Sequence, residues 1–331
     1  MEAGDKILAV MNRIITPELT VICEAQKLLA VHFVATPLVA APGLARSGAD
    51  VYLKLELKLP TGSFKPRGAI WGLAANLRKR EIREVTASST GNHGAAVAFA
   101  AKTLGLRATI FLPANPNPVK RKKIADLGAA IVEAGGADLT DACQQAMEYS
   151  ARPGTYFLND ATDADLPAGP ATIGLEILAQ LPHVGAIFVP MGDTALIRGV
   201  GAAVRQVNPT VKIIGVQAER APSYFLSWRE GRVIPTATCD TCADGLATRT
   251  PDEANVCAIR ELVDDVILVS EAELLGAIRR LYELRGVVAE PAGAAAAAAF
   301  LKQPLSVGPA VLLVTGGNIT DAVRARAGIP Q

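Results

Sequence analysis

Lys65 is the residue of this chain whose type and position most suggest covalent chemistry. It lies in residues 60–68 (PTGSFKPRG), which follow an apolar run and precede a stretch with helical character. The positive partial charge of a helix start favours the neutral amine over the ammonium, and the neutral amine is the form that attacks a carbonyl carbon. A solvated surface lysine is the commoner explanation of such a position. The small and aromatic neighbours favour an activated amine only moderately.

A second junction, residues 88–94 (SSTGNHG), could bind an anion. Small hydroxyl residues and glycines at a strand end let backbone N–H groups converge on a carboxylate, such as that of a substrate. Ser89 or Thr90 could equally be a simple helix N-cap without any function. His93 could act as a base, but in the first turn of a helix it is more readily explained as a structural group.

Two further junctions could hold a phosphate and a flat ring. Residues 190–196 (PMGDTAL) connect a very apolar run to a helical stretch, whose first N–H groups are suited to a phosphate. Residues 312–318 (LLVTGGN) end the last apolar run, and their two glycines permit close approach of a flat ligand or only make a tight turn. Each of these motifs alone is weak, because many strand-to-helix turns look similar.

A parallel α/β fold would bring these four junctions together. Apolar runs of strand length alternate with amphipathic stretches of helix length, and ligands bind beyond the carboxyl ends of the strands in such folds. The predicted strands are 51–57, 85–88, 108–112, 130–133, 186–190, 213–218, 266–269 and 311–315. The predicted helices are 70–80, 94–104, 119–127, 139–149, 172–181, 196–207, 271–284 and 294–301.

The composition indicates a globular protein with a small-molecule partner. The chain has 331 residues, of which 50% are hydrophobic, and its formal net charge of +1 gives no reason to propose binding to nucleic acid or to a membrane surface. The apolar positions between Ile7 and Ile15 predict an amphipathic helix rather than a signal peptide. Charged residues interrupt the most apolar segments, so no membrane span is expected and we place the protein in the cytoplasm.

The five cysteines predict reduced thiols rather than a disulfide framework, because they are odd in number and scattered. The pair Cys239 and Cys242 has the spacing of a zinc or redox motif. Zinc would need a second ligand pair at suitable spacing, and the sequence offers none. Two ordinary loop cysteines are therefore the favoured interpretation.

Taken together, these motifs resemble the fold-type II pyridoxal-phosphate enzymes, which include serine and threonine dehydratases, serine racemase, threonine synthase and cysteine synthase. The matching stretches extend over nearly the whole chain and look like the dehydratase branch: 36–38 (TPL), 54–56 (KLE), 60–68, 91–94 (GNHG), 243–245 (ADG), 290–294 (EPAGA) and 316–318 (GGN). One such match would be weak, but the series in this order is highly specific.

The resemblance implies a tryptophan synthase β-subunit-like fold with two three-layer open-sheet domains and the cofactor in the cleft between them. We expect a large cofactor-binding domain from residues 1–78 plus 160–331 and a small mobile domain from residues 79–159. The chain stops soon after Thr315, so no regulatory domain is expected. A homodimer is implied by the family alone.

The family also implies roles for individual residues around pyridoxal 5'-phosphate. Lys65 would hold the cofactor through a Schiff base and later remove the α-proton, and Thr90 is the second catalytic candidate. The cofactor would be bound by Phe64 near the ring, Asn92 at the 3-hydroxyl, Thr315 at the pyridine nitrogen, Glu290, and the phosphate loop Gly192, Asp193, Thr194, Ala195 and Leu196. The substrate carboxylate would be bound by Ser89, Thr90, Gly91, Asn92 and His93.

The chain departs from the family pattern at three positions. Asp193 stands in a loop that is usually a run of glycines, so its carboxylate must point away from the phosphate, for example to cap the helix, or phosphate affinity will suffer. Thr90 replaces the serine of racemases, which argues against racemase activity. Phe225 stands where the divalent-metal site of relatives has an aspartate, although Glu219 matches, so we predict no tight metal site.

The predicted function is a pyridoxal-phosphate-dependent dehydratase, or ammonia-lyase, acting on a small β-hydroxy amino acid of the L-threonine or L-serine type. A neutral Thr315 hydroxyl cannot enforce a protonated pyridine as an aspartate would, and this weaker electron sink favours loss of a β-leaving group. The main alternative is a β-replacement synthase of the threonine or cysteine synthase type. An amino-acid racemase and a catalytically idle relative that kept the fold are further alternatives.

Overall fold

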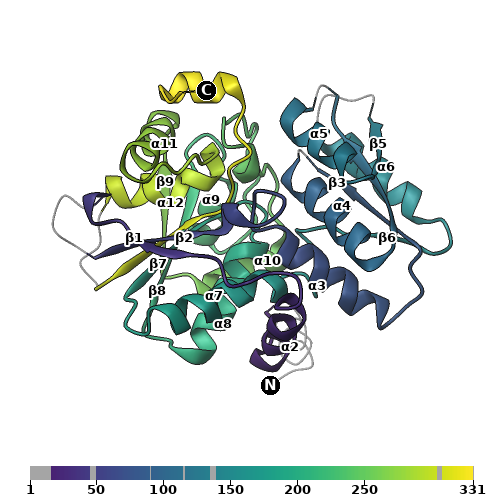
Figure 1. Cartoon of the computed structure of the whole chain (residues 1–331), viewed down its shortest axis with the longest axis horizontal. Helices are drawn as coiled ribbons and strands as arrows, with labels where there is room; N and C mark the ends of the chain where they lie inside the picture. The colour runs from purple at the N-terminus through teal and green to yellow at the C-terminus, as the bar shows by residue number, and fades with distance from the viewer. Residues whose placement is uncertain are drawn as a thin grey trace.

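A computed structural model describes residues 16–44, 50–89, 91–114, 116–134, 139–303 and 308–330. Two β-sheets, each covered by helices, lie side by side (Figure 1). Thr90 and the helix predicted between Ile7 and Ile15 lie outside the described residues. The two-sheet α/β fold predicted from the resemblance is confirmed.

The small sheet has four parallel strands in the order β5-β4-β3-β6. Its strands are β3 (Glu84–Ser88), β4 (Arg107–Leu112), β5 (Ala130–Glu133) and β6 (Thr155–Phe157). The helices that accompany it are α4 (Asn92–Leu104), α5 (Pro118–Asp126) and α6 (Leu139–Ser150). All these strands lie between residues 84 and 157, inside the range expected for a small domain.

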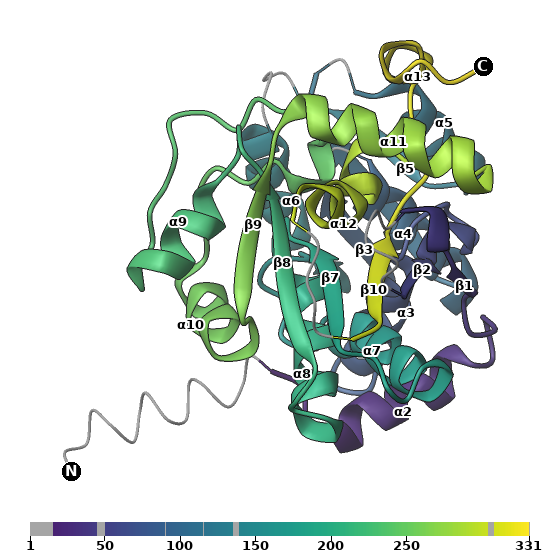
Figure 2. The ribbon, with the colours of Figure 1, turned by 90° about the vertical axis from the view of Figure 1, so that its left-hand side faces the viewer.

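The large sheet has six strands in the order β1-β2-β10-β7-β8-β9. Its strands are β1 (Leu38–Ala40), β2 (Val51–Leu55), β7 (Ala186–Pro190), β8 (Lys212–Ala218), β9 (Asp265–Val269) and β10 (Ala310–Val314). Only β1 is antiparallel to its neighbour, and β10 lies between β2 and β7 although it comes last in the chain. Strands from both ends of the described sequence therefore build one sheet, as Figure 2 shows.

Helices cover both faces of the large sheet. On one face lie α11 (Glu271–Arg285) and α12 (Pro291–Lys302), and on the other α7 (Ala168–Gln180), α8 (Ala195–Val207) and α10 (Glu253–Leu262) (Figure 2). The remaining helices are α2 (Leu19–Leu29), α3 (Pro66–Leu77), α9 (Ser223–Glu230) and α13 (Asp321–Ala327), with short 3-10 turns at Pro42–Leu44, Glu56–Lys58 and Asp244–Leu246. Among the residues described, no helix is both long and apolar enough to cross a membrane.

Strand alternation explains the three layers around each sheet. Successive side chains of a strand point to opposite faces, so a strand buried on both sides is apolar throughout. Leu312 packs into the core beneath α11 and α12, whereas Leu313 packs into the core beneath α7 and α8. In the small sheet Ile110 faces α3 and α4, while Phe111 faces α6. Each sheet is thereby fixed between two helical layers.

Candidate active site

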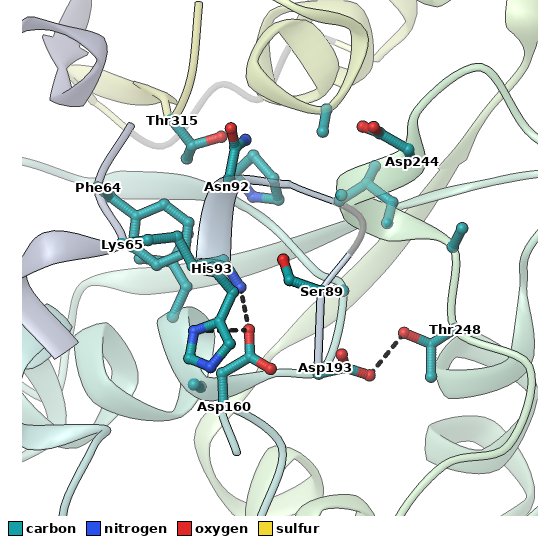
Figure 3. A pocket seen from close by; sticks show the side chains of 18 of the residues that line it. Phe64, Lys65, Ser89, Asn92, His93, Asp160, Asp193, Asp244, Thr248 and Thr315 are labelled. Atoms are coloured by element: carbon teal, nitrogen blue, oxygen red, sulfur yellow. Dashed lines mark hydrogen bonds and ion pairs between the residues drawn. The ribbon is translucent and has the colours of Figure 1, made fainter. Parts of the chain in front are cut away.

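The four junctions identified in the sequence meet around a single cavity, which encloses about 900 Å³ including its open mouth. It lies beyond the carboxyl ends of β3, β7 and β10, at the starts of α3, α4 and α8 (Figure 3). The predicted residues that line it are Phe64, Lys65, Ser89, Asn92, His93, Gly192, Asp193, Thr194, Ala195, Leu196, Glu290 and Thr315. Gly91 packs beside the cavity against Lys120.

The loop that carries Lys65 is tied to the end of β10. The backbone N–H of Phe64 donates to the carbonyl oxygen of Thr315 at 3.0 Å. Ser63 and Gly316 form an antiparallel bridge next to this bond. Two segments some 250 residues apart in the chain, those of Lys65 and Thr315, therefore face the cavity from adjacent positions, as a ligand bound between them would require.

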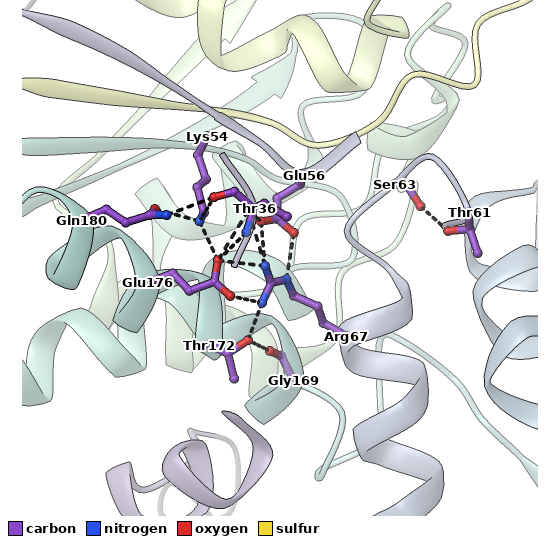
Figure 4. Close-up of polar contacts among 10 residues, drawn as sticks. All are labelled: Thr36, Lys54, Glu56, Thr61, Ser63, Arg67, Gly169, Thr172, Glu176 and Gln180. Atoms are coloured by element: carbon purple, nitrogen blue, oxygen red, sulfur yellow. Dashed lines mark hydrogen bonds and ion pairs between the residues drawn. The ribbon is translucent and has the colours of Figure 1, made fainter. Parts of the chain in front are cut away.

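A buried ion network anchors α3 just after Lys65 (Figure 4). The Arg67 guanidinium, only 2% exposed, donates to Glu56 at 2.8 Å and to Glu176 at 2.6 Å. The fully buried Lys54 ammonium also contacts Glu176. The Thr36 hydroxyl donates to Glu56, while the Thr172 hydroxyl accepts from Arg67 and the Gln180 amide oxygen accepts from Lys54. Two cations and two carboxylates thus balance one another, and the network fixes the helix that begins beside Lys65.

The Lys65 side chain points into the cavity and pairs there with Asp160 (Figure 3). Pro66 is the first residue of α3, where the missing N–H of proline has no cost. His93 also approaches Asp160, with its Nδ1 3.8 Å from the carboxylate oxygen that Lys65 contacts. Its Nε2 lies 2.9 Å from the carbonyl oxygen of Leu158 and must carry the hydrogen, because a carbonyl only accepts.

Asp160 was not predicted from the sequence. It follows β6, a strand of three residues that is too short to give a periodic signal. Burial alone would raise the pKa of the Asp160 carboxyl, but His93 and Lys65 together hold this pKa well below its usual range. Asp160 is therefore a carboxylate at neutral pH and the immediate counter-charge of the Lys65 amine.

Ser89 shapes the loop at the start of α4. Its hydroxyl oxygen accepts hydrogen bonds from the backbone N–H groups of Gly91 at 2.8 Å and Gly94 at 2.9 Å. Gly91 has a φ of 155°, and a Cβ there would lie 2.1 Å from Cδ of Lys120. No side chain fits at this position, so the glycine is required by the close approach of α5.

Asn92 connects the two sides of the cleft. Its amide nitrogen donates to Glu290 at 2.5 Å, and its amide oxygen accepts from Asn318 at 2.8 Å. These two bonds fix the orientation of the amide. The prediction that Asn92 and Glu290 share a site with Thr315 agrees with this placement, although their roles towards a cofactor stay predictions.

Two lysines of α5 reach across the cleft, which the sequence did not reveal. Lys120 is 3% exposed and lies 2.6 Å from a carboxylate oxygen of Asp244 and 3.2 Å from one of Glu290. Burial alone would lower its pKa, but these two carboxylates raise it, so the ammonium form is favoured. Lys123 donates to the carbonyl oxygen of Thr61 at 2.9 Å. The run KRKK at 120–123 is typical of a solvated helix face. The contacts of Lys120 and Lys123 across the cleft are therefore visible only in the three-dimensional structure.

The loop at the start of α8 offers free donors to an anion. No side chain caps this helix, so its first backbone N–H groups remain available. Thr194 at the N-cap has a φ of 70°, and a Cβ at Gly192 would lie 2.3 Å from the carbonyl oxygen of Gly245. Both residues give the tight turn that brings the N–H groups to the cavity.

Asp193 neither caps the helix nor points freely into the cavity. One of its carboxylate oxygens accepts a hydrogen bond from the Thr248 hydroxyl at 2.8 Å. Burial raises the pKa of Asp193, and the negative charge of Asp160 raises it further. Both effects disfavour the charged form of Asp193, which is the form that would repel a phosphate.

Arg198 lies behind this loop and supplies a positive charge. Its guanidinium is buried and donates to the Thr194 hydroxyl at 3.2 Å and to the carbonyl oxygen of Ala161 at 3.0 Å. The predicted phosphate loop, residues 192–196, and the loop that carries Asp160 are thus held together by the Arg198 side chain.

These groups fit pyridoxal 5'-phosphate. An amine that can bond a carbonyl carbon, uncapped N–H groups for a phosphate and a hydroxyl at Thr315 all line one cavity. Gly316 approaches Glu290 so closely that a Cβ there would lie 1.9 Å from the carboxylate, so a larger residue would displace the Glu290 side chain. Lys65, the residues 192–196, Asn92 and Thr315 are the ones that would hold the cofactor.

Other candidate features are less suited to chemistry. Burial and Glu271 raise the pKa of the Cys242 thiol to about 12, so this thiol stays protonated at neutral pH, unlike a redox-active one. In the described part of the chain no three His, Cys, Asp or Glu side chains gather as a metal site would require. The absence of a tight metal site near Glu219 and Phe225 stays a prediction.

A cleft of this design, between two open α/β sheets, is that of a fold-type II pyridoxal-phosphate enzyme. Residues 29–316 match the family model of the pyridoxal-phosphate dependent enzymes, and the chain belongs to this family. The predicted cofactor is thereby confirmed as that of the family.

Sequence and structure comparisons agree on the relatives. The chain is 39% identical over 274 residues to an L-threonine ammonia-lyase of Thermotoga maritima, covering 82% of this chain and 68% of the relative. It is 34% identical over 278 residues to the L-threonine dehydratase catabolic TdcB of Escherichia coli, covering 83% and 84%. Maize serine racemase superposes with a TM-score of 0.88 at 29% identity, covering 95% and 97% of the two chains.

Proposed function

We propose that this chain is a pyridoxal-phosphate-dependent ammonia-lyase that converts a small β-hydroxy amino acid of the L-threonine or L-serine type to a 2-oxo acid and ammonia. The observation that carries the proposal is the convergence of Lys65, Asn92, Thr315 and residues 192–196 on one cavity. The relatives named L-threonine ammonia-lyase and L-threonine dehydratase support the same reaction.

Lys65 is the residue that moves the proton. When bound, the cofactor supplies an electron-withdrawing ring that stabilises negative charge at the substrate's α-carbon. Lys65 Nζ, as a neutral amine, accepts the α-proton. The β-hydroxyl takes up one proton from solvent and departs as water, and Lys65 afterwards returns the α-proton to solvent. The resulting enamine takes up one water and gives the 2-oxo acid and ammonia, so the waters lost and gained balance.

The remaining residues bind and orient. The loop from Ser89 to His93, with Thr90 among its members, would hold the substrate carboxylate through backbone N–H groups at the start of α4. Thr315 presents a neutral hydroxyl to the ring position, and Phe64 lies beside Lys65, with the ammonium 5.4 Å from the ring centre. A neutral partner at the ring nitrogen weakens the electron sink, which suits fast β-elimination better than prolonged carbanion chemistry.

The test is a substrate panel assayed with added pyridoxal phosphate. Serine, threonine, phenylserine and 3-hydroxyaspartate are scored for ammonia and for 2-oxo acid. We expect at least one to give both products in equal amounts. Incorporation of an added thiol or amine without oxo acid would instead establish a β-replacement synthase, and inversion at the α-carbon without oxo acid would establish a racemase.

The wider organisation is part of the proposal. We infer a large domain of residues 1–78 plus 160–331, a mobile small domain of residues 79–159, a homodimer and a cytoplasmic location. Light scattering on the purified protein would measure the mass of the assembly, and a mass near one 34.5 kDa chain would contradict the homodimer.

A further inference from the structure

Asp160 lines the cavity and has no role in the function proposed above. Its side chain is 14% exposed and pairs with the Lys65 amine, and His93 approaches the same carboxylate oxygen (Figure 3). The three groups come from different parts of the fold, namely the start of α3, the loop after β6 and the start of α4. A carboxylate placed against the reactive amine must affect where that amine stays.

The loop around Asp160 is held rigidly by its other polar groups. The Asn159 side chain accepts from the backbone N–H of Ala161 at 2.8 Å. Asp163 accepts from the backbone N–H groups of Asp165 at 2.9 Å and Leu166 at 3.0 Å. These two side chains stabilise the loop itself, whereas the carboxylate of Asp160 points at Lys65.

The loop is also fixed from outside. The carbonyl oxygen of Ala161 accepts hydrogen bonds at 3.0 Å from both Arg198 and Asn255. Arg198 belongs to α8 and donates to the hydroxyl of Thr194, the N-cap of this helix, which is part of the predicted phosphate loop. The position of Asp160 is therefore coupled to the anion-binding end of the cavity, and its carboxylate cannot move far from Lys65.

We infer that Asp160 is a positioning residue for Lys65, which holds the lysine amine inside the cavity whenever that amine is not bonded to the cofactor. The ion pair keeps Nζ within reach of the α-carbon instead of letting the four-carbon side chain swing to solvent. His93, anchored to Leu158, lies 3.8 Å from the same carboxylate oxygen that Lys65 contacts. The inference rests on the proposed function only for the statement that Lys65 is the reactive amine.

Chemical labelling of Lys65 tests this directly without turnover. The full chain is treated with limiting acetic anhydride in the presence of 4-deoxypyridoxine 5'-phosphate, which lacks the aldehyde and so leaves Lys65 unbonded. Acetylation of Lys65 is measured by peptide mass spectrometry relative to the exposed Lys102. In Asp160→Asn we expect Lys65 to be labelled about threefold faster or more at pH 7, because no carboxylate then holds the amine inside the cavity and away from the reagent.

Matched variants separate this role from a structural one. Asp165→Asn removes a carboxyl from the same loop that pairs with Lys79 outside the cavity, and it should leave Lys65 labelling unchanged. Asp160→Glu keeps the charge and should restore much of the protection, whereas Asp160→Gln should not. If Asp160→Asn does not fold, the Glu and Gln variants give the same comparison. Equal labelling of Lys65 in the charged and uncharged variants would overturn the inference.

Turnover supplies the second readout. A positioning role predicts that kcat in Asp160→Asn falls about tenfold or more while KM changes by less than about threefold. The amine is then displaced from the α-carbon, whereas the groups that bind the substrate stay in place. Altered labelling with no turnover of any hydroxy amino acid by the wild type would refute the proposed reaction and leave the role of Asp160 standing. If the enzyme is active and Lys65 is labelled equally in the wild type and in Asp160→Asn, the proposed reaction stands and the role of Asp160 is refuted.

Discussion

The ammonium of Lys120 lies 2.6 Å from the carboxylate of Asp244 and joins α5, beside the small sheet, to the 3-10 turn on the far side of the cleft. The same ammonium contacts Glu290, which in turn accepts from Asn92. A chain of polar contacts thus crosses the cleft at the mouth of the cavity. It holds the two sides at the separation at which the site residues meet.

Replacing Lys120 by methionine should destabilise the protein and weaken catalysis together. The side chain keeps its length against Gly91, but Asp244 and the buried Glu290 lose their cation, which should lower the free energy of unfolding by about 3 kcal/mol. Urea denaturation at pH 7 measures the loss, and kcat/KM should fall with it. Lys122→Met, on the exposed face of the same helix, should change stability by less than about 0.5 kcal/mol. Equal effects of the two variants would contradict the role of Lys120.

Replacing Arg67 by lysine should be far from conservative. The guanidinium donates to Glu56 and Glu176 at once, and an ammonium cannot reproduce this fork. We expect the free energy of unfolding to fall by about 3 kcal/mol, with reduced activity because α3 carries Lys65 at its start. The matched control is Arg78→Lys, since Arg78 is 57% exposed, and a change within about 0.5 kcal/mol is expected there. Retention of full stability in Arg67→Lys would show that the network is dispensable.

Asp193→Asn should strengthen phosphate binding. The substitution removes a carboxyl from the loop that receives the phosphate and keeps an oxygen to accept from Thr248. We expect pyridoxal phosphate to bind about threefold tighter or more, whereas pyridoxal without the phosphate should bind unchanged. Fluorescence titration with both compounds measures this. A parallel change for both compounds would assign the effect to something other than the phosphate, and Asp126→Asn on the surface serves as the control variant.

The same substitution should change how stability depends on pH. Because the pKa of Asp193 is raised in the folded protein, this carboxyl contributes stability at pH below about 4, where the unfolded chain is also protonated. That contribution is lost as the pH rises through the raised pKa. An amide at this position does not titrate, so the stability of Asp193→Asn relative to the wild type should rise as the pH increases from 4 to 7. A constant difference across this range would argue against the raised pKa.

The long buried strands were predictable because their signal is local. The apolar run at 186–190 matches the buried strand β7 from end to end, and the run at 213–218 matches the buried part of β8. The glycine and small polar residues that follow β7 mark its junction. The strands β1 and β6 were missed, since three residues at a sheet edge give no periodicity. The helices α9, α10 and α13 were missed as well, and their burial comes from packing against distant elements.

Some residues of the site could likewise be predicted from a local sequence signal, and others could not. Lys65, Asn92 and Thr315 follow strands or begin helices, so their place beyond the strand ends could be predicted from order alone. Asp160 and Lys120 reach the cavity only through the packing of the small sheet against the large one. Nothing in their immediate sequence distinguishes them from solvated charges, and three-dimensional contact was needed to find them.

The most direct test of the account is to locate the cofactor bond. The protein loaded with pyridoxal phosphate is reduced with borohydride, digested and examined by mass spectrometry for the added pyridoxyl phosphate group. We predict that the group is found on Lys65 and that Lys65→Ala, still folded by circular dichroism, shows neither the modification nor the yellow Schiff-base absorbance. A wild type that stays colourless and unmodified, or a modification on any other lysine, would contradict the central claim.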